Sequence, residues 1–375
     1  MALVAWVLLA LVAGSFVFSA LVILGARSYR AVRPPRLSDP APISILKPLS
    51  GLDEGLEENL RSFFSQDYPA FEIIFSVRHE NDPAVPLVEK LRAEYREIPA
   101  RLLVTGEPPC ANAKVFALER MLWSARFDLL VMSDSDTRVA PGLLRAIAAE
   151  FQDQRLGLAT CPYRAVPGGG IWSALEAIGM NTEFLAGILA ARLLEGMKFG
   201  VGPTMAIRRE VVGRMGGFEA FKDYLAEDFE MGRRAASLGY RTILSSSVIE
   251  HRIGTARMRP NFEHRLRWVR STRRSRPAGY LGQLFTYPLP LALLLWAIRP
   301  VWWPAAALAI AMRAAAAWAT AGWVLSDRLT LTRWWLVPFE DILSFAFWIA
   351  GFFGNTVIWR GHRYVVNRNG TFSPQ

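Results

Sequence analysis

Residues 129–136 read Leu-Leu-Val-Met-Ser-Asp-Ser-Asp, an apolar run that ends abruptly in polar and acidic side chains. The run predicts a buried strand, and where a strand gives way to a loop, carboxylates two residues apart can converge on one cation. Mg²⁺ and Mn²⁺ prefer oxygen ligands and often keep substrate phosphates in their shell. Asp134 and Asp136 are therefore candidate metal ligands. The alternative is a loop whose aspartates cap the helix expected near Pro141.

Short apolar strands alternate with helical patterns around this motif. Strands are expected at 43–46, 71–77, 101–104 and 129–132, and helices at 56–65, 86–95, 114–123 and 141–151. Such alternation favours a mainly parallel sheet with helices on both faces, whose ligands bind beyond the carboxyl ends of the strands. The sequence thus predicts a Rossmann-like α/β domain over residues 42–276, with the acidic motif at its ligand-binding edge.

Further polar residues follow the other expected strands. Lys47 and Pro48 follow the first strand, Asp82 follows the second, and Asn112 and Lys114 precede a helix. Loops at strand ends can hold a uridine and its phosphates. Each of these residues taken alone is equally a turn signal.

A second acidic motif, Ala-Glu-Asp-Phe-Glu at 226–230, precedes an amphipathic stretch that runs to Leu238. A carboxylate at the start of a helix is stabilised in its charged form by the helix dipole. Charged Asp228 can therefore act as a general base that takes a proton from an attacking hydroxyl. The alternative is that Asp228 only caps the helix.

The third motif is basic and aromatic. His-Arg-Leu-Arg-Trp at 264–268 is followed by Arg270, Arg273, Arg274 and Arg276. Arginine forms forked hydrogen bonds to phosphates and stacks on aromatic rings, while tryptophan offers a flat face to a sugar or base. The alternative is a basic cluster beside a membrane segment that binds anionic lipid.

The composition indicates a membrane protein. Of 375 residues, 52% are hydrophobic and only 20% charged, and the formal net charge is +10. A positive charge suits either nucleic acid or anionic lipid, and the apolar content favours the membrane, so no nucleic-acid partner is expected. The two cysteines, Cys110 and Cys161, form no CxxC pair. This argues against a disulfide framework or a structural zinc site.

Apolar runs predict several membrane spans. Residues 1–26 carry no charge, and the C-terminal region 281–359 contains runs at 281–298, 300–326 and 342–359. Such runs are typical of spanning helices. Residues 171–199 are expected to form either an interfacial helix or an amphipathic core helix. Arg313 is expected to pair with Glu340 or Asp341, or to lie at interface depth.

The charges beside these runs predict an orientation. The first run is followed by four arginines, Arg27, Arg30, Arg33 and Arg36. Because positive residues stay on the inner side of a membrane, the α/β domain is expected to be cytoplasmic. The membrane is expected to be a bacterial inner membrane. The same rule prefers the basic tail at 360–375 inside, whereas one plus three spans would place it outside. A re-entrant run, or membrane contact by 171–199, would resolve this conflict.

Together these pieces resemble the ceramide glucosyltransferase family, whose catalytic core has a type-A glycosyltransferase fold. The resemblance covers almost the whole chain. The matching stretches lie at 43–51 (Ile-Ser-Ile-Leu-Lys-Pro-Leu-Ser-Gly), 63–69 (Phe-Phe-Ser-Gln-Asp-Tyr-Pro), 81–84 (Asn-Asp-Pro-Ala), 134–136, 226–228, 267–268 and 359–364 (Trp-Arg-Gly-His-Arg-Tyr).

The resemblance implies roles for single residues. Asp82 would contact the nucleotide base, Asp134 and Asp136 would hold the metal and diphosphate, and Asp228 would be the catalytic base. The family's motif of Gln or Arg, two residues, then Arg-Trp is filled by His264, Arg267 and Trp268, with histidine in the unusual first place. The family is expected to use a UDP-sugar and to invert the anomeric configuration.

The acceptor implied is a lipid hydroxyl, and ceramide is one candidate. A hopanoid polyol is another, because a related bacterial group resembles this sequence and also has histidine at the first place of the motif. Three rivals are a processive polysaccharide synthase, a dolichyl-phosphate sugar synthase and a non-enzymatic lipid-binding protein. A polysaccharide synthase needs more spanning helices than this chain offers, to build a translocation channel. A dolichyl-phosphate sugar synthase needs no base to deprotonate its acceptor. A lipid-binding protein without enzymatic activity would tolerate substitutions at Asp134 and Asp228.

Overall fold

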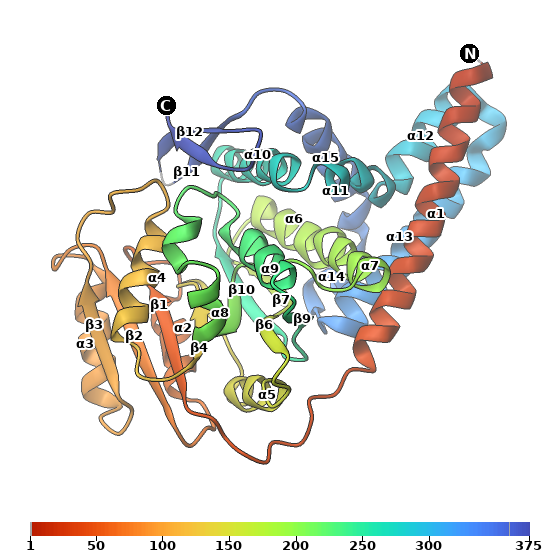
Figure 1. Cartoon of the computed structure of the whole chain (residues 1–375). Coiled ribbons are helices and arrows are strands. Elements are labelled where there is room, and N and C mark those ends of the chain that lie inside the picture. Colours follow the sequence, from red (N-terminus) through yellow and green to blue (C-terminus); the bar gives the residue numbers. More distant parts are fainter. Residues whose placement is uncertain (1, 360) are drawn as a thin grey trace. The chain divides into compact units, whose positions relative to one another are not determined.

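The computed structural model describes residues 2–359 and 361–375, so Met1 and Arg360 lie outside the described residues (Figure 1). Its contacts divide the chain into two units. The sheet unit comprises Arg33–Tyr163, Met197–Gly254 and Gly370–Gln375, and the helical unit comprises Met1–Val32, Arg164–Gly196 and Thr255–Asn369. The expected domain at 42–276 is therefore divided, because two of its segments pack with the helical unit.

The sheet unit is built on seven strands in the order β3-β2-β1-β4-β8-β6-β9. Strands β3, β2, β1 and β4 are parallel, β8 runs antiparallel to both β4 and β6, and β9 is parallel to β6. The strands span Ile43–Pro48 (β1), Phe71–Val77 (β2), Ala100–Val104 (β3), Leu129–Ser133 (β4), Leu156–Thr160 (β6), Thr204–Arg208 (β8) and Arg241–Leu244 (β9). The predicted α/β fold with a mainly parallel sheet is confirmed.

The register of β1 and β4 places the loops after them side by side. Leu46 pairs with Met132, so the next residues along each strand, Lys47 and Ser133, stand at the same edge. Every residue of β4 is buried, which fits its uninterrupted apolar sequence. The acidic motif therefore begins where the central strand ends.

Helices connect these strands. They span Leu56–Phe64 (α2), Ala84–Glu94 (α3), Ala113–Ser124 (α4), Leu143–Glu150 (α5), Arg209–Arg214 (α8) and Glu227–Ser237 (α9), with a 3₁₀ turn at Phe218–Phe221. Two further strands, β5 (Thr137–Arg138) and β10 (Ile249–Gly254), pair in antiparallel fashion. Two other short strands are β7 (Tyr163–Pro167) and β13 (Phe372–Pro374). The four helices expected before residue 152 all form within a few residues of their predicted bounds.

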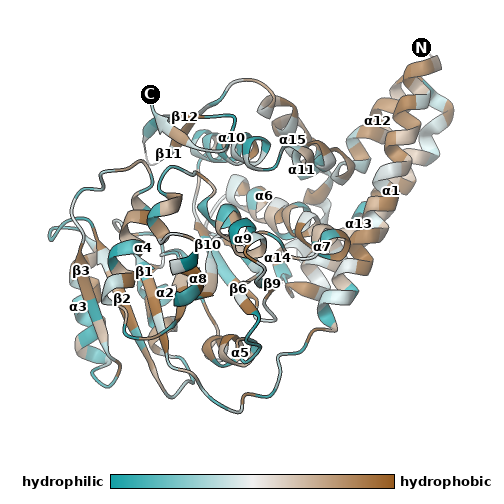
Figure 2. Cartoon of the chain, in the orientation of Figure 1, coloured by the Kyte–Doolittle hydropathy of each residue, from teal (hydrophilic) through white to brown (hydrophobic). Residues whose placement is uncertain are grey.

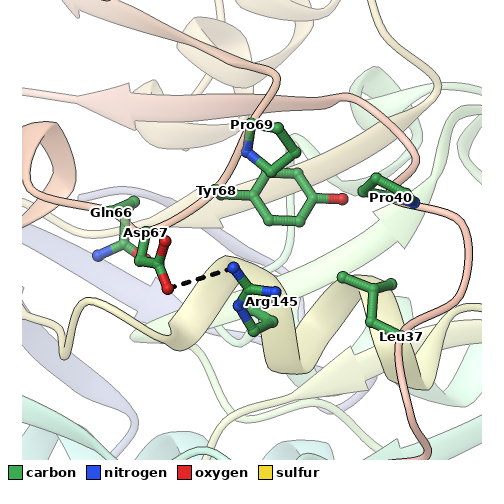
Figure 3. A pocket seen from close by; sticks show the side chains of 7 residues that line it. All are labelled: Leu37, Pro40, Gln66, Asp67, Tyr68, Pro69 and Arg145. Carbon is green, nitrogen blue, oxygen red and sulfur yellow. Dashed lines mark hydrogen bonds and ion pairs between the residues drawn. The ribbon is translucent and has the colours of Figure 1, made fainter.

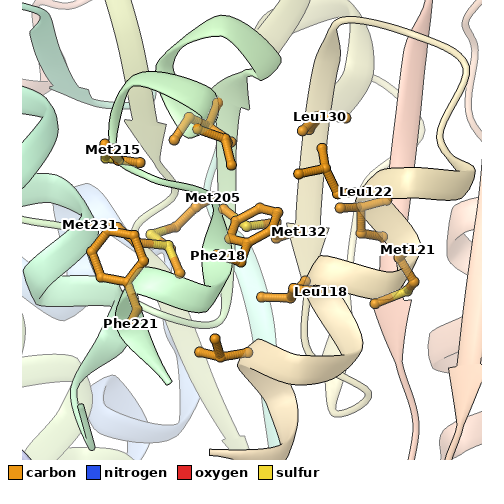
Figure 4. Close-up of a cluster of buried hydrophobic side chains, with 14 of the residues drawn as sticks. Leu118, Met121, Leu122, Leu130, Met132, Met205, Met215, Phe218, Phe221 and Met231 are labelled. Carbon is orange, nitrogen blue, oxygen red and sulfur yellow. The ribbon is translucent and has the colours of Figure 1, made fainter. Parts of the chain in front are cut away.

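One apolar cluster packs α4, the 3₁₀ turn and α9 against the sheet (Figure 4). Leu118 and Met121 come from α4, Met132 from β4, and Phe218 and Met231 from the later segments. A fully buried side chain of this size contributes about 1.5–3 kcal/mol. This cluster fixes the three elements that carry Lys114, Asp134 and Asp228.

The helical unit contains the long apolar helices, which are mostly brown in Figure 2. The helices span Ala2–Arg30 (α1), Ile171–Gly179 (α6), Leu185–Glu195 (α7), Met258–Ser275 (α10), Pro277–Gly282 (α11), Pro288–Ile298 (α12), Trp303–Ala317 (α13), Arg328–Thr332 (α14) and Val337–Gly351 (α15). π-Helical segments at Met180–Phe184 and Trp318–Val324 extend α6 and α13. Strands β11 (Thr356–Trp359) and β12 (His362–Val366) form an antiparallel hairpin.

Three helical stretches in the described chain are long and apolar enough to cross a membrane: Ala2–Arg30, Ile171–Glu195 and Pro300–Val324. A fourth candidate is the pair Pro277–Thr286 and Pro288–Ile298, which bends by 63°. The run expected at 342–359 differs, because its helix ends at Gly351 and residues 356–359 form β11. Ile171–Glu195 joins the candidate spans instead of residues 342–359.

Buried ion pairs hold the helical unit together. Arg313 Nε donates to Asp341 at 2.8 Å, and Arg265 donates to both oxygens of Glu340 at 2.7 and 3.0 Å. The predicted pairing of Arg313 with an acidic residue of α15 is confirmed. Because an unpaired buried charge is costly, each carboxylate of α15 needs its arginine.

Candidate active site

Lys114 links two acidic motifs in the sheet unit. Its ammonium lies 2.6 Å from Asp134 Oδ1 and 3.1 Å from Glu227 Oε1. Burial lowers the pKa of Lys114, but the attraction of both carboxylates outweighs burial and holds its pKa above the ordinary value. Asn112 adds a contact by donating from Nδ2 to Glu227 Oε2 at 3.2 Å. The start of α4 thus joins the loop after β4 to the start of α9.

Asp228 stands in the first turn of α9, beside this bridge. Burial, reinforced by the neighbouring Glu227 carboxylate, raises the pKa of Asp228 to about 7. Such a carboxyl can exchange a proton near neutral pH, which is what a general base requires. The predicted role of Asp228 therefore has a physical basis.

Glycines let the segment Phe199–Gly202 lie directly against α9. A Cβ on Gly202 would stand 2.9 Å from Asp228 Oδ2, and one on Gly200 would meet the Asp228 carbonyl. A Cβ on Gly232 would overlap the backbone of Phe199 and Gly200. Close approach of backbone to backbone explains these glycines better than any need for positive φ.

Asp136 faces β10 and not Lys114. Its Oδ2 lies 3.1 Å from Nε2 of His251, while its Oδ1 is buried without a hydrogen-bond partner. Burial raises the pKa of Asp136, but the charge and hydrogen bond of His251 outweigh burial and lower its pKa overall. A buried carboxylate oxygen with no donor is the kind of group that a cation would satisfy.

The described residues contain no group of three or more His, Cys, Asp or Glu side chains placed to hold a metal ion. Asp134 and Asp136 point to different partners, because Lys114 takes one and His251 the other. Burial also raises the pKa of Asp134, despite the neighbouring Lys114 ammonium. A cation at this motif would therefore compete with Lys114 for Asp134.

Lys47 holds the acidic loop after β4 through hydrogen bonds. Its side chain is fully buried, and its Nζ donates to the Asp134 carbonyl, to Thr137 Oγ1 at 2.9 Å and to Ser133 Oγ at 3.4 Å. Burial lowers the pKa of Lys47 to about 7. Since an ammonium has three donors and all three are used, this geometry favours a role in holding the loop over a direct contact with a nucleotide.

Asp82 and Asn112 order neighbouring loops. The Asp82 carboxylate accepts hydrogen bonds from the backbone N–H of Gly51, at 3.1 and 3.2 Å, and of Ala84, at 2.9 Å. Asn112 caps α4 by accepting from Val115 N at 3.1 Å. Asp82 thereby ties the loop after β1 and Pro48 to the start of α3, where a nucleotide base is expected.

Residues 66–69 of the stretch at 63–69 line a pocket of about 470 Å³ in the sheet unit, together with Leu37, Pro40 and Arg145 (Figure 3). Tyr68 donates its hydroxyl to the Ala41 carbonyl at 2.6 Å, and Arg145 pairs with Asp67 at 3.2 Å. None of the predicted site residues is among the seven that line this cavity. The stretch therefore organises a loop and lies outside the acidic site.

The basic-aromatic motif lies on α10 in the helical unit. His264 Nδ1 is hydrogen-bonded to the Glu176 carboxylate of α6, and Asn261 donates to the other oxygen of Glu176 at 2.5 Å. The Trp268 ring lies 5.3 Å from His264 and 5.4 Å from Phe184, centroid to centroid. Helix α10 thus holds His264 and Trp268 as a packed pair, with Arg267 one position before Trp268.

Sequence reasoning missed two members of the acidic site. Glu227 was within a quoted motif but was given no role, and its pairing with Lys114 and Asn112 follows from α4 packing beside α9. His251 lies on β10, opposite Thr137 in the register. Its signal was slight: it is one of only four histidines in the chain.

The chain matches the family described as glycosyl transferase family 21 over residues 4–372, nearly its full length. This chain belongs to glycosyl transferase family 21. The resemblance to ceramide glucosyltransferases predicted from the motifs is confirmed by curated relatives.

Two curated relatives are ceramide glucosyltransferases. Ceramide glucosyltransferase 1 of Caenorhabditis elegans is 29% identical over 230 residues, which are 61% of this family 21 chain and 49% of that protein. The ceramide glucosyltransferase of Komagataella phaffii is 37% identical over 106 residues, 27% of this chain and 21% of that one. The chain spans about half the length of the Caenorhabditis relative.

Among solved structures, this family 21 chain is similar to a mannosyltransferase from Pyrobaculum calidifontis in complex with GDP-mannose and Mn²⁺. The likeness has a TM-score of 0.55 at 21% identity and covers 92% of this chain and 98% of that one. At this identity it speaks for the fold alone. The predicted type-A glycosyltransferase fold is thereby confirmed.

The close packing of α9 on Phe199–Gly202 yields a first prediction. Gly232→Ala should lower the free energy of unfolding by about 1–3 kcal/mol, because the added methyl group has no room to enter. Denaturant unfolding in detergent, followed by tryptophan fluorescence, measures the loss. Backbone amides at 199–202 should also exchange hydrogen faster.

The matched control is Gly213→Ala in α8, where an added Cβ meets nothing within 4 Å. That variant should be neutral or slightly more stable, since alanine favours a helix over glycine. Equal behaviour of the two variants would show that the contact does not constrain α9.

Proposed function

We propose that the protein is a membrane-bound inverting glycosyltransferase that transfers a hexose, preferably glucose, from a UDP-sugar to the hydroxyl of a lipid, ceramide first among the candidates. The observation that carries the proposal is Asp228, a partly buried carboxyl with its pKa raised to about 7 beside the Lys114–Asp134 pair. Membership of family 21 and the names of the curated relatives support the reaction class.

In this proposal Asp228 accepts the proton of the acceptor hydroxyl while that oxygen attacks the anomeric carbon. The bond from the anomeric carbon to the diphosphate breaks, and its electron pair leaves with UDP. The Lys114 ammonium stands near the developing negative charge, where a fixed cation lowers the barrier. Asp82 and the loop after β1 would hold the uridine.

A single displacement inverts the anomeric configuration, whereas retention needs a second carboxylate as nucleophile. Glu227 is the carboxylate next to Asp228, and both of its oxygens are engaged, one by Lys114 and one by Asn112. An oxygen held in this way is a poor nucleophile. The contacts of Glu227 thus support inversion.

A divalent cation, Mg²⁺ or Mn²⁺, fits the acidic motif through Asp136, whose Oδ1 is buried and has no donor. Asp134 and Asp136 would hold the cation, with His251 orienting Asp136 through the bond to its Oδ2. When bound, such a cation neutralises charge on the leaving diphosphate.

The acceptor would meet the protein at the membrane. The three candidate spans and the apolar pair around Tyr287 support a multi-pass protein, and the arginines that end α1 support a cytoplasmic sheet unit. The membrane in this proposal is a bacterial inner membrane. His264, Arg267 and Trp268 would contribute to catalysis from α10. A hopanoid polyol remains the second acceptor to test.

The function is tested by UDP release from purified protein in detergent. UDP-glucose and UDP-N-acetylglucosamine are each offered with ceramide or a hopanoid polyol, with and without EDTA. Lipid-dependent release is expected, and Asp228→Asn should reduce its rate about 10²–10⁴-fold, the range typical of a lost general base.

Asp128→Asn is the matched control, because the Asp128 side chain is 92% exposed in the same unit. It should keep full activity. Absence of lipid-stimulated release from folded protein with every donor and acceptor pair would contradict the proposal. Retained activity in Asp228→Asn would instead favour a phosphate acceptor, which needs no base.

The raised pKa of Asp228 also predicts a pH profile. A general base works only when deprotonated, so kcat/KM should fall about tenfold for each pH unit below about 7. Initial rates measured between pH 5.5 and 8.5, roughly the window in which such a group titrates, give the profile. The residual activity of Asp228→Asn should lack this limb. If it kept the limb, another group would be responsible.

Metal binding can be measured without activity. Mn²⁺ titrated into the protein with UDP and followed by electron paramagnetic resonance should bind, and Asp136→Asn should weaken binding at least about tenfold, as expected for a lost ligand. Asp128→Asn again serves as control. Unchanged affinity in Asp136→Asn would remove Asp136 from the proposed metal site.

A further inference from the structure

The second half of α10 carries arginines without acidic partners. Arg265 pairs with Glu340 and Arg276 pairs with Glu195 at 2.6 Å, but Arg270, Arg273 and Arg274 between them pair with no carboxylate among residues 2–359 and 361–375. An arginine without a counter-charge can bind an anion from outside the chain, because its planar donor fork matches the oxygens of a phosphate.

Backbone carbonyls hold two of these side chains in place. Arg273 donates to the carbonyls of Phe352 and Gly354, the latter at 2.7 Å, and Arg270 donates to the carbonyl of Thr356. These carbonyls lie where α15 ends and β11 begins. The guanidinium groups are therefore positioned before any ligand arrives.

Donors remain unused after these contacts. The Nε atoms of Arg270, Arg273 and Arg274 are all buried and have no hydrogen-bond acceptor in the described structure. Leaving a buried donor unsatisfied costs about 1–3 kcal/mol, and more when the group is charged. Three such donors on one helix indicate that an acceptor with several oxygens belongs here.

The electrostatics point the same way. Burial lowers the pKa of Arg274, and the positive charges of Arg273 and Arg368 lower it further. Arg368, which follows β12, therefore contributes to the same positive field and pairs with no carboxylate in the described part of the chain. A phosphate would relieve this repulsion and accept from several guanidinium groups at once.

The surroundings indicate where the phosphate comes from. Phe353, between the two carbonyls that Arg273 contacts, is 69% exposed, and Leu281 in α11 is 59% exposed. The apolar pair Pro277–Thr286 and Pro288–Ile298 begins one residue after Arg276. Exposed aromatic and apolar side chains beside arginines are typical of a membrane interface.

We propose that Arg270, Arg273, Arg274 and Arg368 form a binding site for the phosphate of an anionic phospholipid, with Phe353 and Leu281 in the acyl-chain boundary. The site is distinct from the residues assigned to sugar transfer. It goes beyond the proposed function, because lipid binding here requires neither the donor nor the acceptor.

The test uses the full chain in an uncharged detergent. Binding of dioctanoyl-phosphatidylglycerol and of dioctanoyl-phosphatidylcholine is measured by native mass spectrometry. The anionic lipid should bind more tightly, and Arg274→Gln/Arg368→Gln should weaken it about fivefold for each arginine, the equivalent of about 1 kcal/mol each. Neither side chain makes a hydrogen bond within residues 2–359 and 361–375, so this pair of substitutions should leave the fold intact.

Arg257→Gln/Arg276→Gln removes the same charge from the two ends of α10 and should keep the affinity of the original protein. Equal losses in both double variants would reduce the effect to net charge and overturn the site. Unchanged binding in Arg274→Gln/Arg368→Gln would overturn it as well. Displacement of the lipid by inorganic phosphate at equal concentration would overturn the lipid assignment and leave a soluble phosphate site.

Discussion

The sheet unit depends on one shared charge, the Lys114 ammonium between Asp134 and Glu227. It joins helix α4, the loop after the central strand β4, and helix α9. Helices α4 and α9 are about a hundred residues apart in the sequence. Glu227 is buried and the other two groups are partly buried, so removal of any one would leave charge with less compensation. The pKa of Asp228 beside this bridge is raised by burial and by the carboxylate of the preceding residue, Glu227, and the Lys114 ammonium opposes that rise.

The two units use arginine and lysine in different ways. In the sheet unit Lys114 is paired with two carboxylates, and Lys47 donates to carbonyl and hydroxyl oxygens. In the helical unit Arg265 forms an ion pair with Glu340, and Arg313 forms one with Asp341. Arg270, Arg273 and Arg274 form no ion pair among the described residues, and their Nε atoms have no acceptor there. Part of the net charge of +10 therefore lies on side chains proposed to bind ligand or lipid, and not only on side chains that keep the surface soluble.

The sequence predicted what local patterns encode. The strands β1, β2 and β4, the helices between them and the position of Asp134 follow from apolar runs and turn residues, whose effects are short in range. It could not place Glu227 or His251, because their partners are brought together by long-range packing and by antiparallel strands that return from distant segments. Lys47 was expected to meet a nucleotide, and only the structure shows that all its donors are used.

The order of segments in the two units has a practical consequence. Arg164–Gly196 of the helical unit is inserted between two stretches of the sheet unit, and Gly370–Gln375 returns to the sheet unit after the last apolar helix. Trimming the chain at its ends therefore cannot release the sheet unit as an independent soluble fragment. A water-soluble version would require excision of residues 164–196 and 255–369, with one linker that joins Tyr163 to Met197 and another that joins Gly254 to Gly370. This is a rearrangement of connectivity and not a truncation.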